Sequence, residues 1–199
     1  MAYLDANATE PLRPEARAAA LAALDLVGNP ASVHGAGRAA RRVLEQARER
    51  LAARFGTSAA GIVFTSGGTE ADALAIHGLG PGRRIIVGAT EHDAIRAAVP
   101  SAVVLPVDRD GVARLDLLPA LLADGPALVC LMLANNETGT VQPVAGAAAL
   151  CRAAGALLHV DAVQAAGRCP VSLAALGAHS LAVSSHKLGG PPGAGALLL

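Results

Sequence analysis

The sequence predicts an α/β fold of three layers, in which a mainly parallel sheet lies between helices. Two observations indicate this class. Short β-like runs alternate with Ala-rich helical stretches, which is typical of strand–helix–strand units. Several of the runs are continuously apolar, as expected of strands that are covered on both faces. The 199 residues are enough for one hydrophobic core of this kind.

The expected elements follow from the spacing of apolar residues. Seven strands are predicted, at residues 61–65, 84–87, 102–107, 127–133, 157–160, 181–184 and 194–198. Helices are predicted at residues 43–54, 69–77, 117–123 and 144–154. The first should end at Gly56, because glycine readily adopts the left-handed conformation that terminates helices. The Arg-rich stretch that overlaps this helix, residues 38–54, predicts a solvent-exposed or subunit-facing surface, with anion binding as the alternative.

Composition argues against several classes of function. Lys and Arg together number 16, as do Asp and Glu, so the zero net charge leaves no electrostatic footprint for nucleic acid. Apolar residues make up 53 %, which argues against disorder, and aromatic residues make up 2 %, which argues against base-stacking platforms. The longest apolar run, residues 127–134, is too short for a membrane span, and no signal peptide pattern begins the chain. We therefore expect a cytoplasmic protein.

The three cysteines form neither a disulfide framework nor a zinc motif. Cys130, Cys151 and Cys169 are an odd number, and none lies in a C-x-x-C pair or near a pair of histidines. Cys130 lies within an apolar run and is interpreted as a small buried hydrophobic residue. No metal site is expected.

Residues 62–72 run from an apolar strand through a turn of small residues into a helix. Such a turn exposes the first amide groups of the helix, and these donors together with the positive end of the helix dipole favour a phosphate. Gly67 and Gly68 would let the anion approach without a Cβ in the way. The alternative is an ordinary turn in which Thr69 caps the helix.

Polar residues also follow two later strands. Asp161 comes after an apolar strand, where ligands bind in open α/β sheets. A buried carboxylate there needs a cationic neighbour, such as a protonated pyridine nitrogen, unless Asp161 only caps a helix. Lys187 follows another strand and can act as an amine nucleophile if its surroundings lower its pKa, whereas a surface lysine is the alternative. Ser184 and His186 beside it can donate hydrogen bonds to an anion.

These motifs occur in one order along the chain, together with His92, Asn136 and Gln164. In that order the sequence resembles the cysteine desulfurases of the class V aminotransferase group, which are fold-type I pyridoxal phosphate enzymes. The resemblance covers essentially the entire chain. The segments that carry it are residues 3–9, 28–34, 65–72, 90–92, 135–139, 159–164 and 181–190.

The resemblance implies pyridoxal 5'-phosphate as the cofactor. Lys187 would bind it covalently, Asp161 would pair with its pyridinium nitrogen, and His92 would stack on the ring and assist proton transfer. The catalytic residues would thus be Lys187 and His92, although a lone histidine is otherwise interpreted as structural or capping. Asn136 and Gln164 would contact the side of the ring that carries the phenolic oxygen. The phosphate would be held by Gly68, Thr69, Ser184 and His186.

The sequence departs from the family pattern at three places. Glu10 stands where a second threonine is common, and Ser185 stands where glycine or alanine usually precedes the histidine. Only twelve residues follow Lys187. We therefore expect residues 1–199 to comprise the N-terminal segment and most of the cofactor-binding large domain, without the small C-terminal domain. The absent part would carry the nucleophilic cysteine, to which none of the three cysteines here is equivalent.

The function implied by the resemblance is desulfuration of L-cysteine to alanine. The sulfur would pass through an enzyme cysteine to an acceptor or scaffold protein, for iron–sulfur cluster or thio-cofactor assembly, and the full-length protein would be a homodimer. Two alternatives stay open. One is another class V enzyme, such as a selenocysteine lyase or a small-molecule aminotransferase. The other is a non-catalytic fragment that only binds the cofactor.

Overall fold

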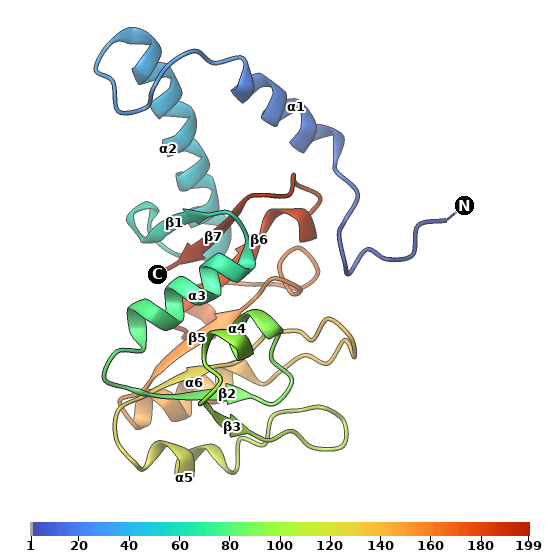
Figure 1. Cartoon of the computed structure of the whole chain (residues 1–199), viewed down its shortest axis with the longest axis vertical. Coiled ribbons are helices and arrows are strands. Elements are labelled where there is room, and N and C mark those ends of the chain that lie inside the picture. The colour runs from blue at the N-terminus through green and yellow to red at the C-terminus, as the bar shows by residue number, and fades with distance from the viewer. Residues whose placement is uncertain (1) are drawn as a thin grey trace.

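The protein folds around one seven-stranded sheet, seen in Figure 1 in a computed structural model that describes residues 2–199. The strand order is β1-β7-β6-β5-β4-β2-β3. Neighbouring strands from β6 to β3 pair in parallel, whereas β7 runs antiparallel to both β1 and β6. The strands are β1 (Ile62–Thr65), β2 (Arg84–Gly88), β3 (Val103–Leu105), β4 (Ala127–Cys130), β5 (Leu157–Asp161), β6 (Ser180–Ser184) and β7 (Gly195–Leu198).

Helices cover both faces of the sheet, which confirms the predicted three-layer class. Leu128 and Cys130 of β4 pack in a cluster with residues of α3 and α4, whereas Val129 between them packs in a cluster with residues of α5 and α6. This is the alternation expected of a strand with two covered faces. The helices are α1 (Pro14–Leu24), α2 (Gly35–Phe55), α3 (Gly68–Leu79), α4 (Asp93–Ala98), α5 (Leu118–Leu122), α6 (Val144–Ala153) and α7 (Leu173–Leu176), with short 3₁₀ turns at Ala59–Gly61 and Ser185–Lys187.

All seven predicted strands are present, but two are shorter than predicted by more than one residue. The expected strand 127–133 ends at Cys130, because its neighbour β2 pairs with it only as far as Val87. Beyond that point the chain still donates backbone hydrogen bonds to β5, from Leu131 and Leu133. The expected strand 102–107 is reduced to three residues, because Pro106 has no N–H to continue the ladder.

The four predicted helices are present, and three others were not predicted. The helix expected at 43–54 begins earlier, at Gly35, and ends at Gly56, whose φ of 68° is left-handed as expected. The unpredicted helices are α1, α4 and α7. Helices α4 and α7 have six and four residues, which is too short for apolar periodicity to be recognised. Helix α1 offered Pro14 at its first position as a signal.

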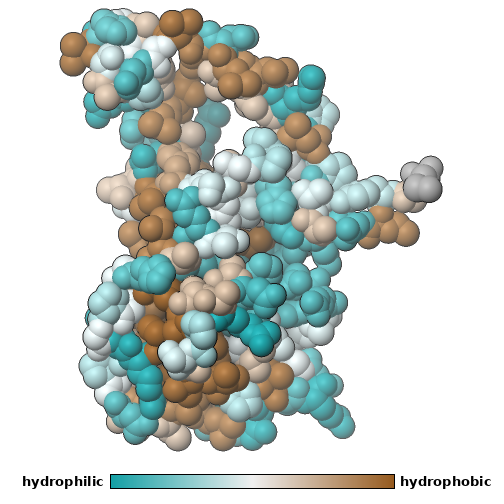
Figure 2. Space-filling view, viewed as in Figure 1, coloured by the Kyte–Doolittle hydropathy of each residue, from teal (hydrophilic) through white to brown (hydrophobic). Residues whose placement is uncertain are grey.

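The N-terminal arm, residues 2–34, lies largely outside the core. Figure 1 shows α1 projecting away from the sheet beside the first turns of α2, and Figure 2 shows hydrophobic residues on that surface. Among the described residues, α1 buries none. Leu24 and Val27 are 80 % and 84 % exposed. Helix α2 buries only Gly37, Ala52 and Phe55 among its 21 residues, so its arginine-rich surface is exposed, as expected.

The cysteines lie in or near the core. Cys130 and Cys151 are fully buried, and Cys169 is partly buried. Burial raises the pKa of the Cys130 thiol, and it raises that of Cys151 to about 11. The interpretation of Cys130 as a small hydrophobic residue is therefore confirmed. Among residues 2–199, no three His, Cys, Asp or Glu side chains gather as a metal ion would need. Within the same range, no helix combines the length and apolar character needed to cross a membrane.

Candidate active site

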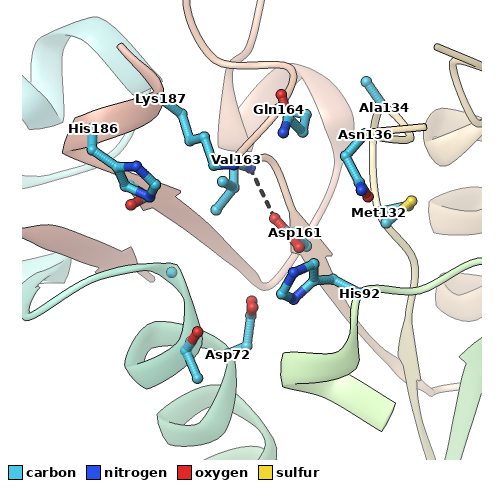
Figure 3. A pocket seen from close by; sticks show the side chains of 13 residues that line it. Asp72, His92, Met132, Ala134, Asn136, Asp161, Val163, Gln164, His186 and Lys187 are labelled. Atoms are coloured by element: carbon cyan, nitrogen blue, oxygen red, sulfur yellow. Dashed lines mark hydrogen bonds between the residues drawn. The ribbon is translucent and has the colours of Figure 1, made fainter. Parts of the chain in front are cut away.

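A cavity of about 260 Å³ opens at the carboxyl ends of β5 and β6 (Figure 3). Its volume is near the lower end of the roughly 300–1,000 Å³ of small-molecule sites. The residues around it come from the start of α3, the loops that follow β2 and β4, and the ends of β5 and β6. The structure brings together in this cavity all the candidate residues named from the sequence: Gly68, Thr69, His92, Asn136, Asp161, Gln164, Ser184, His186 and Lys187.

The turn before α3 forms a cradle on one side of the cavity. Gly68 leaves no room for a side chain, because a Cβ there would lie 2.6 Å from Cγ2 of Val163. Ser184 is 1 % exposed, and its hydroxyl has no hydrogen-bond partner among residues 2–199. The interpretation of Thr69 as the helix cap is wrong. Gly67 occupies the cap position and makes no side-chain bond, so the first amides of α3 stay available to an anion.

Glu70 stabilises the same turn from the solvent side. Its carboxylate accepts hydrogen bonds from the backbone N–H and the hydroxyl of Ser66, both at 2.6 Å. These two bonds hold the pKa of Glu70 below its usual range. The acidic side chain is therefore held by the residue before the glycines and does not line the cavity.

Asp161 is the last residue of β5 and is 7 % exposed. One of its oxygens accepts a hydrogen bond from the Val163 backbone at 2.8 Å, the dashed line in Figure 3. Within residues 2–199 no ion pair involves Asp161. Burial, reinforced by the nearby Asp72 carboxyl, raises the pKa of Asp161 to about 7. A buried carboxylate without a cation takes up a proton in this way, so the site is suited to a cationic ligand.

Lys187 enters the cavity from the 3₁₀ turn that follows β6. Its Nζ donates a hydrogen bond to the backbone carbonyl of Asn7 in the N-terminal arm. Burial and the nearby Arg168 lower the pKa of Lys187, so more of the amine is uncharged than at an ordinary lysine. His186 is joined to the same arm, because its Nδ1 lies 3.0 Å from the Thr9 hydroxyl.

His92 caps a helix and also lines the cavity. It precedes α4, and its Nδ1 accepts a hydrogen bond from the backbone N–H of Ala94 at 3.1 Å, so it caps the helix. Its ring also lines the cavity, beside Asp161 in Figure 3. Because Nδ1 acts as an acceptor, the neutral ring carries its proton on Nε2.

Asn7 contacts three of the candidate residues but was not singled out from the sequence. Its carbonyl accepts hydrogen bonds from Lys187 and, at 2.9 Å, from Nε2 of Gln164. Its side chain donates to the backbone carbonyl of Asn136 at 3.1 Å. The arm thus contacts three residues that line the cavity. Only its membership of the 3–9 motif could have indicated this, because backbone carbonyl contacts leave no pattern in the sequence.

Asp72 is the charged cavity residue that the sequence reasoning missed. It is 1 % exposed, lines the cavity and lies three residues after Thr69 on α3. Residues three apart share a helix face, so this spacing was a usable signal. Burial raises the pKa of Asp72 to about 7. The other cavity residues not predicted are Met132, Ala134 and Val163.

The fold and the cavity together define a class of protein. It is an α/β protein in which a lysine and a buried carboxylate share a cavity at the carboxyl ends of parallel strands, beside a glycine turn that opens a helix. Comparison with known families agrees with this class. The family described as aminotransferase class-V matches residues 2–199, and the chain belongs to that family.

Individual relatives indicate a group within this family, the cysteine desulfurases. A cysteine desulfurase of Cereibacter sphaeroides is 47 % identical over 211 residues, which cover 99 % of this chain and 54 % of the relative. A solved structure of a NifS-like protein from Rickettsia africae ESF-5 matches with a TM-score of 0.93 and 34 % identity over 99 % of this chain and 57 % of that one. A structure described as SspA in complex with cysteine has a TM-score of 0.92 and 25 % identity, covering 100 % of this chain and 61 % of that one. The resemblance to cysteine desulfurases is thus confirmed, and the chain spans about half the length of the curated relatives it matches.

Proposed function

We propose that this chain forms the pyridoxal 5'-phosphate-binding part of a cysteine desulfurase. The observation that carries the proposal is the meeting of Lys187, Asp161 and the Gly68 cradle in one cavity. Residues 1–199 would supply the N-terminal segment and most of the large domain, and a small C-terminal domain would complete the enzyme.

The residues present fit this cofactor at three points. The unpartnered hydroxyl of Ser184 and the free amides of α3 fit a phosphate, with Thr69 and His186 beside them. Asp161 lacks the cation that its burial requires, and a protonated pyridine nitrogen would supply one. Lys187 offers an amine with a lowered pKa. When bound, the cofactor supplies an electron sink for carbanion chemistry.

The side chains of the cavity would then have separate roles in binding the cofactor and in proton transfer. Lys187 would hold the cofactor through Nζ and, when released, accept and return a proton at that atom. His92, held by its bond to Ala94, would stack on the ring and present the proton on Nε2. Asn136 and Gln164 would contact the side of the ring with the phenolic oxygen, because neutral amides do not compete with Lys187 for the cofactor.

L-cysteine is the substrate that the comparisons favour. Relatives are named cysteine desulfurases, and one structural neighbour is described in complex with cysteine. The sulfur would pass through an enzyme cysteine to an acceptor or scaffold protein, in a cytoplasmic homodimer. That cysteine would lie outside this chain, because none of Cys130, Cys151 and Cys169 lines the cavity. The chain alone should therefore bind the cofactor without releasing sulfide.

The attachment test uses a property of the composition: Lys187 is the only lysine in the chain. Incubation with pyridoxal phosphate should produce a visible absorbance band, and borohydride reduction followed by mass spectrometry should place one adduct on the peptide that contains Lys187. The variant K187A should lose both signals. An adduct confined to the N-terminal amine, or a band that survives in K187A, would refute the proposal.

The reaction test uses the full-length gene product, because the chain covers about half of its relatives. Release of sulfide and alanine from L-cysteine would support desulfuration. Amino-group transfer from another amino acid without sulfide release would instead indicate an aminotransferase of the same family.

A further inference from the structure

Three buried polar side chains lie behind the cavity in a hydrogen-bonded chain. Asp72 on α3, His159 on β5 and Ser180 on β6 are 1 %, 0 % and 0 % exposed. Oδ1 of Asp72 lies 3.0 Å from Nε2 of His159, and Nδ1 of the same ring lies 2.8 Å from the Ser180 hydroxyl. Asp72 also lines the cavity, so the chain connects the cavity to the interior of the sheet.

His159 remains neutral in this setting, because complete burial lowers its pKa to about 4. A neutral imidazole has one N–H donor and one acceptor nitrogen, so two proton arrangements satisfy both contacts when any proton on Asp72 lies on Oδ1, the oxygen that faces the ring. If Asp72 is ionised, Nε2–H donates to it and Nδ1 accepts from Ser180. If Asp72 is protonated, it donates to Nε2, and Nδ1–H donates to the Ser180 oxygen. The two arrangements differ by one proton in total, carried by Asp72.

The charges around Asp72 favour its protonated form when the cavity holds no cation. Asp161 lies two residues beyond His159 on the same face of β5. The Asp72 carboxyl raises the pKa of Asp161, and two such neighbouring carboxyls titrate as a coupled pair. Glu91, which precedes α4, and Cys130 on β4 also face Asp72 and add no positive charge. His92 borders the same cavity. The segments of β1, β6 and β7 that pack on α3 carry no charged residue.

We propose that Asp72 is a positioning residue whose proton sets the tautomer of His159, and that a cation in the cavity releases this proton and reverses both hydrogen bonds of the ring. The second half rests on the proposed function, because the cation would be the ring of the cofactor. The proton leaves to solvent, Asp72 becomes an acceptor from Nε2, and the Ser180 hydroxyl turns to donate to Nδ1. The negative charge at the base of the cavity thus increases when a cationic ring arrives.

The first experiment observes the ring nitrogens of His159 in the cofactor-free wild-type chain by ¹⁵N NMR. The spectrum should show the Nδ1–H tautomer at low pH and the Nε2–H tautomer at high pH, with a midpoint near the Asp72 pKa of about 7. Added pyridoxal phosphate should move this midpoint to lower pH. A tautomer that stays constant from pH 5 to 9 without cofactor would overturn the inference. A tautomer transition whose midpoint does not move when the cofactor is added would overturn the claim that a cation in the cavity releases the Asp72 proton. If the cofactor nevertheless attaches to Lys187, the proposed function stands although this claim fails.

Variants identify the group that titrates. D72N should make the His159 tautomer independent of pH, because an amide does not ionise in this range. D161N should keep the transition and shift it to lower pH, since the repulsion between the two carboxylates is removed. D116N is the matched control: Asp116 is an exposed aspartate paired with Arg114, and its removal should leave the transition unchanged. Persistence of the transition in D72N would assign the proton elsewhere and refute the proposal.

The unfolding free energy gives a measurement that does not need resolved histidine signals. The folded Asp72 has a pKa of about 7 and the unfolded one has a pKa near 3.8, so the folded state binds more protons between these values. The contribution of Asp72 to stability should therefore decrease as pH rises from about 4 and level off above about 7. The difference in stability between D72N and the wild type should therefore change with pH over this range, and the difference between D116N and the wild type should not. If D72N is too unstable to study, S180A should retain the pH dependence of stability while it removes one partner of the ring.

Discussion

The N-terminal arm and the base of the cavity are both rich in apolar residues, yet they contribute to the molecule in opposite ways. Helix α1 reads PEARAAALAAL and buries none of its described residues, whereas β5 and β6 are almost entirely buried. Figure 1 shows the contrast as an arm that projects away from the sheet. An apolar pattern thus predicts that an element forms, but it does not identify what the element packs against.

The candidate site combines both regions. Asp161, Ser184 and Asp72 are held by strands and a helix inside the core, so their positions depend on packing. The arm contributes Asn7 and Thr9, which reach Lys187 and His186 only through exposed hydrogen bonds. Substitutions in the core should therefore change stability first, whereas substitutions in the arm should change binding with little effect on stability.

The largest contrast is expected from the same substitution in the two regions. Leu158 in β5 is 0 % exposed and Leu24 in the arm is 80 % exposed. L158A should lower the free energy of unfolding by about 2–5 kcal/mol, because it removes buried methyl groups and leaves a cavity. L24A should change it by no more than about 0.5 kcal/mol. Urea unfolding followed by circular dichroism measures both, and equal losses would mean that α1 is packed against a partner in solution.

A smaller effect is expected where the glycine turn meets β5. G68A places a methyl group 2.6 Å from Cγ2 of Val163, a stiff β-branched side chain, and should cost about 1–3 kcal/mol of stability. The double variant G68A/V163A should recover part of this loss, because it removes the clashing carbon. G78A is the matched control on the same helix. No atom lies within 4 Å of the added carbon there, and stability should rise by about 0.5–1 kcal/mol. A loss in G68A that V163A does not relieve would refute this explanation.

The sequence predicted the sheet and the cavity better than it predicted the contacts between them. Strands 157–160 and 181–184 were recognisable because each is an apolar run with polar residues immediately after it, and parallel strands bring such ends together. Each strand end was thereby a candidate ligand site, and the resemblance to cysteine desulfurases then assigned Asp161 and Lys187 to one cofactor. The hydrogen-bonded chain from Asp72 through His159 to Ser180 could not be predicted, because its contacts depend on which strands are neighbours in the sheet. The local spacing of apolar residues does not determine that order. The contacts of Asn7 with Lys187 and Gln164 could not be predicted either, because they use its backbone carbonyl, which every residue type has.

The smallest effect tests the arm itself and separates binding from stability. T9V removes the hydroxyl that lies 3.0 Å from Nδ1 of His186 and keeps the shape of the side chain. A hydrogen bond of this kind contributes about 0.5–1.5 kcal/mol, so the dissociation constant for pyridoxal phosphate should rise by roughly 2- to 12-fold.

The matched control for T9V is T57V, which removes another threonine hydroxyl, bonded to the carbonyl of Leu199 and outside the cavity. T57V should lower the unfolding free energy by a similar amount and leave cofactor affinity unchanged. T9V should do the reverse, because its bond joins an exposed arm to a residue of the cavity and adds little to the core. If T9V instead lowers stability as much as T57V and binds the cofactor as well as the wild type, the arm is a structural element of the core and does not position the cavity residues.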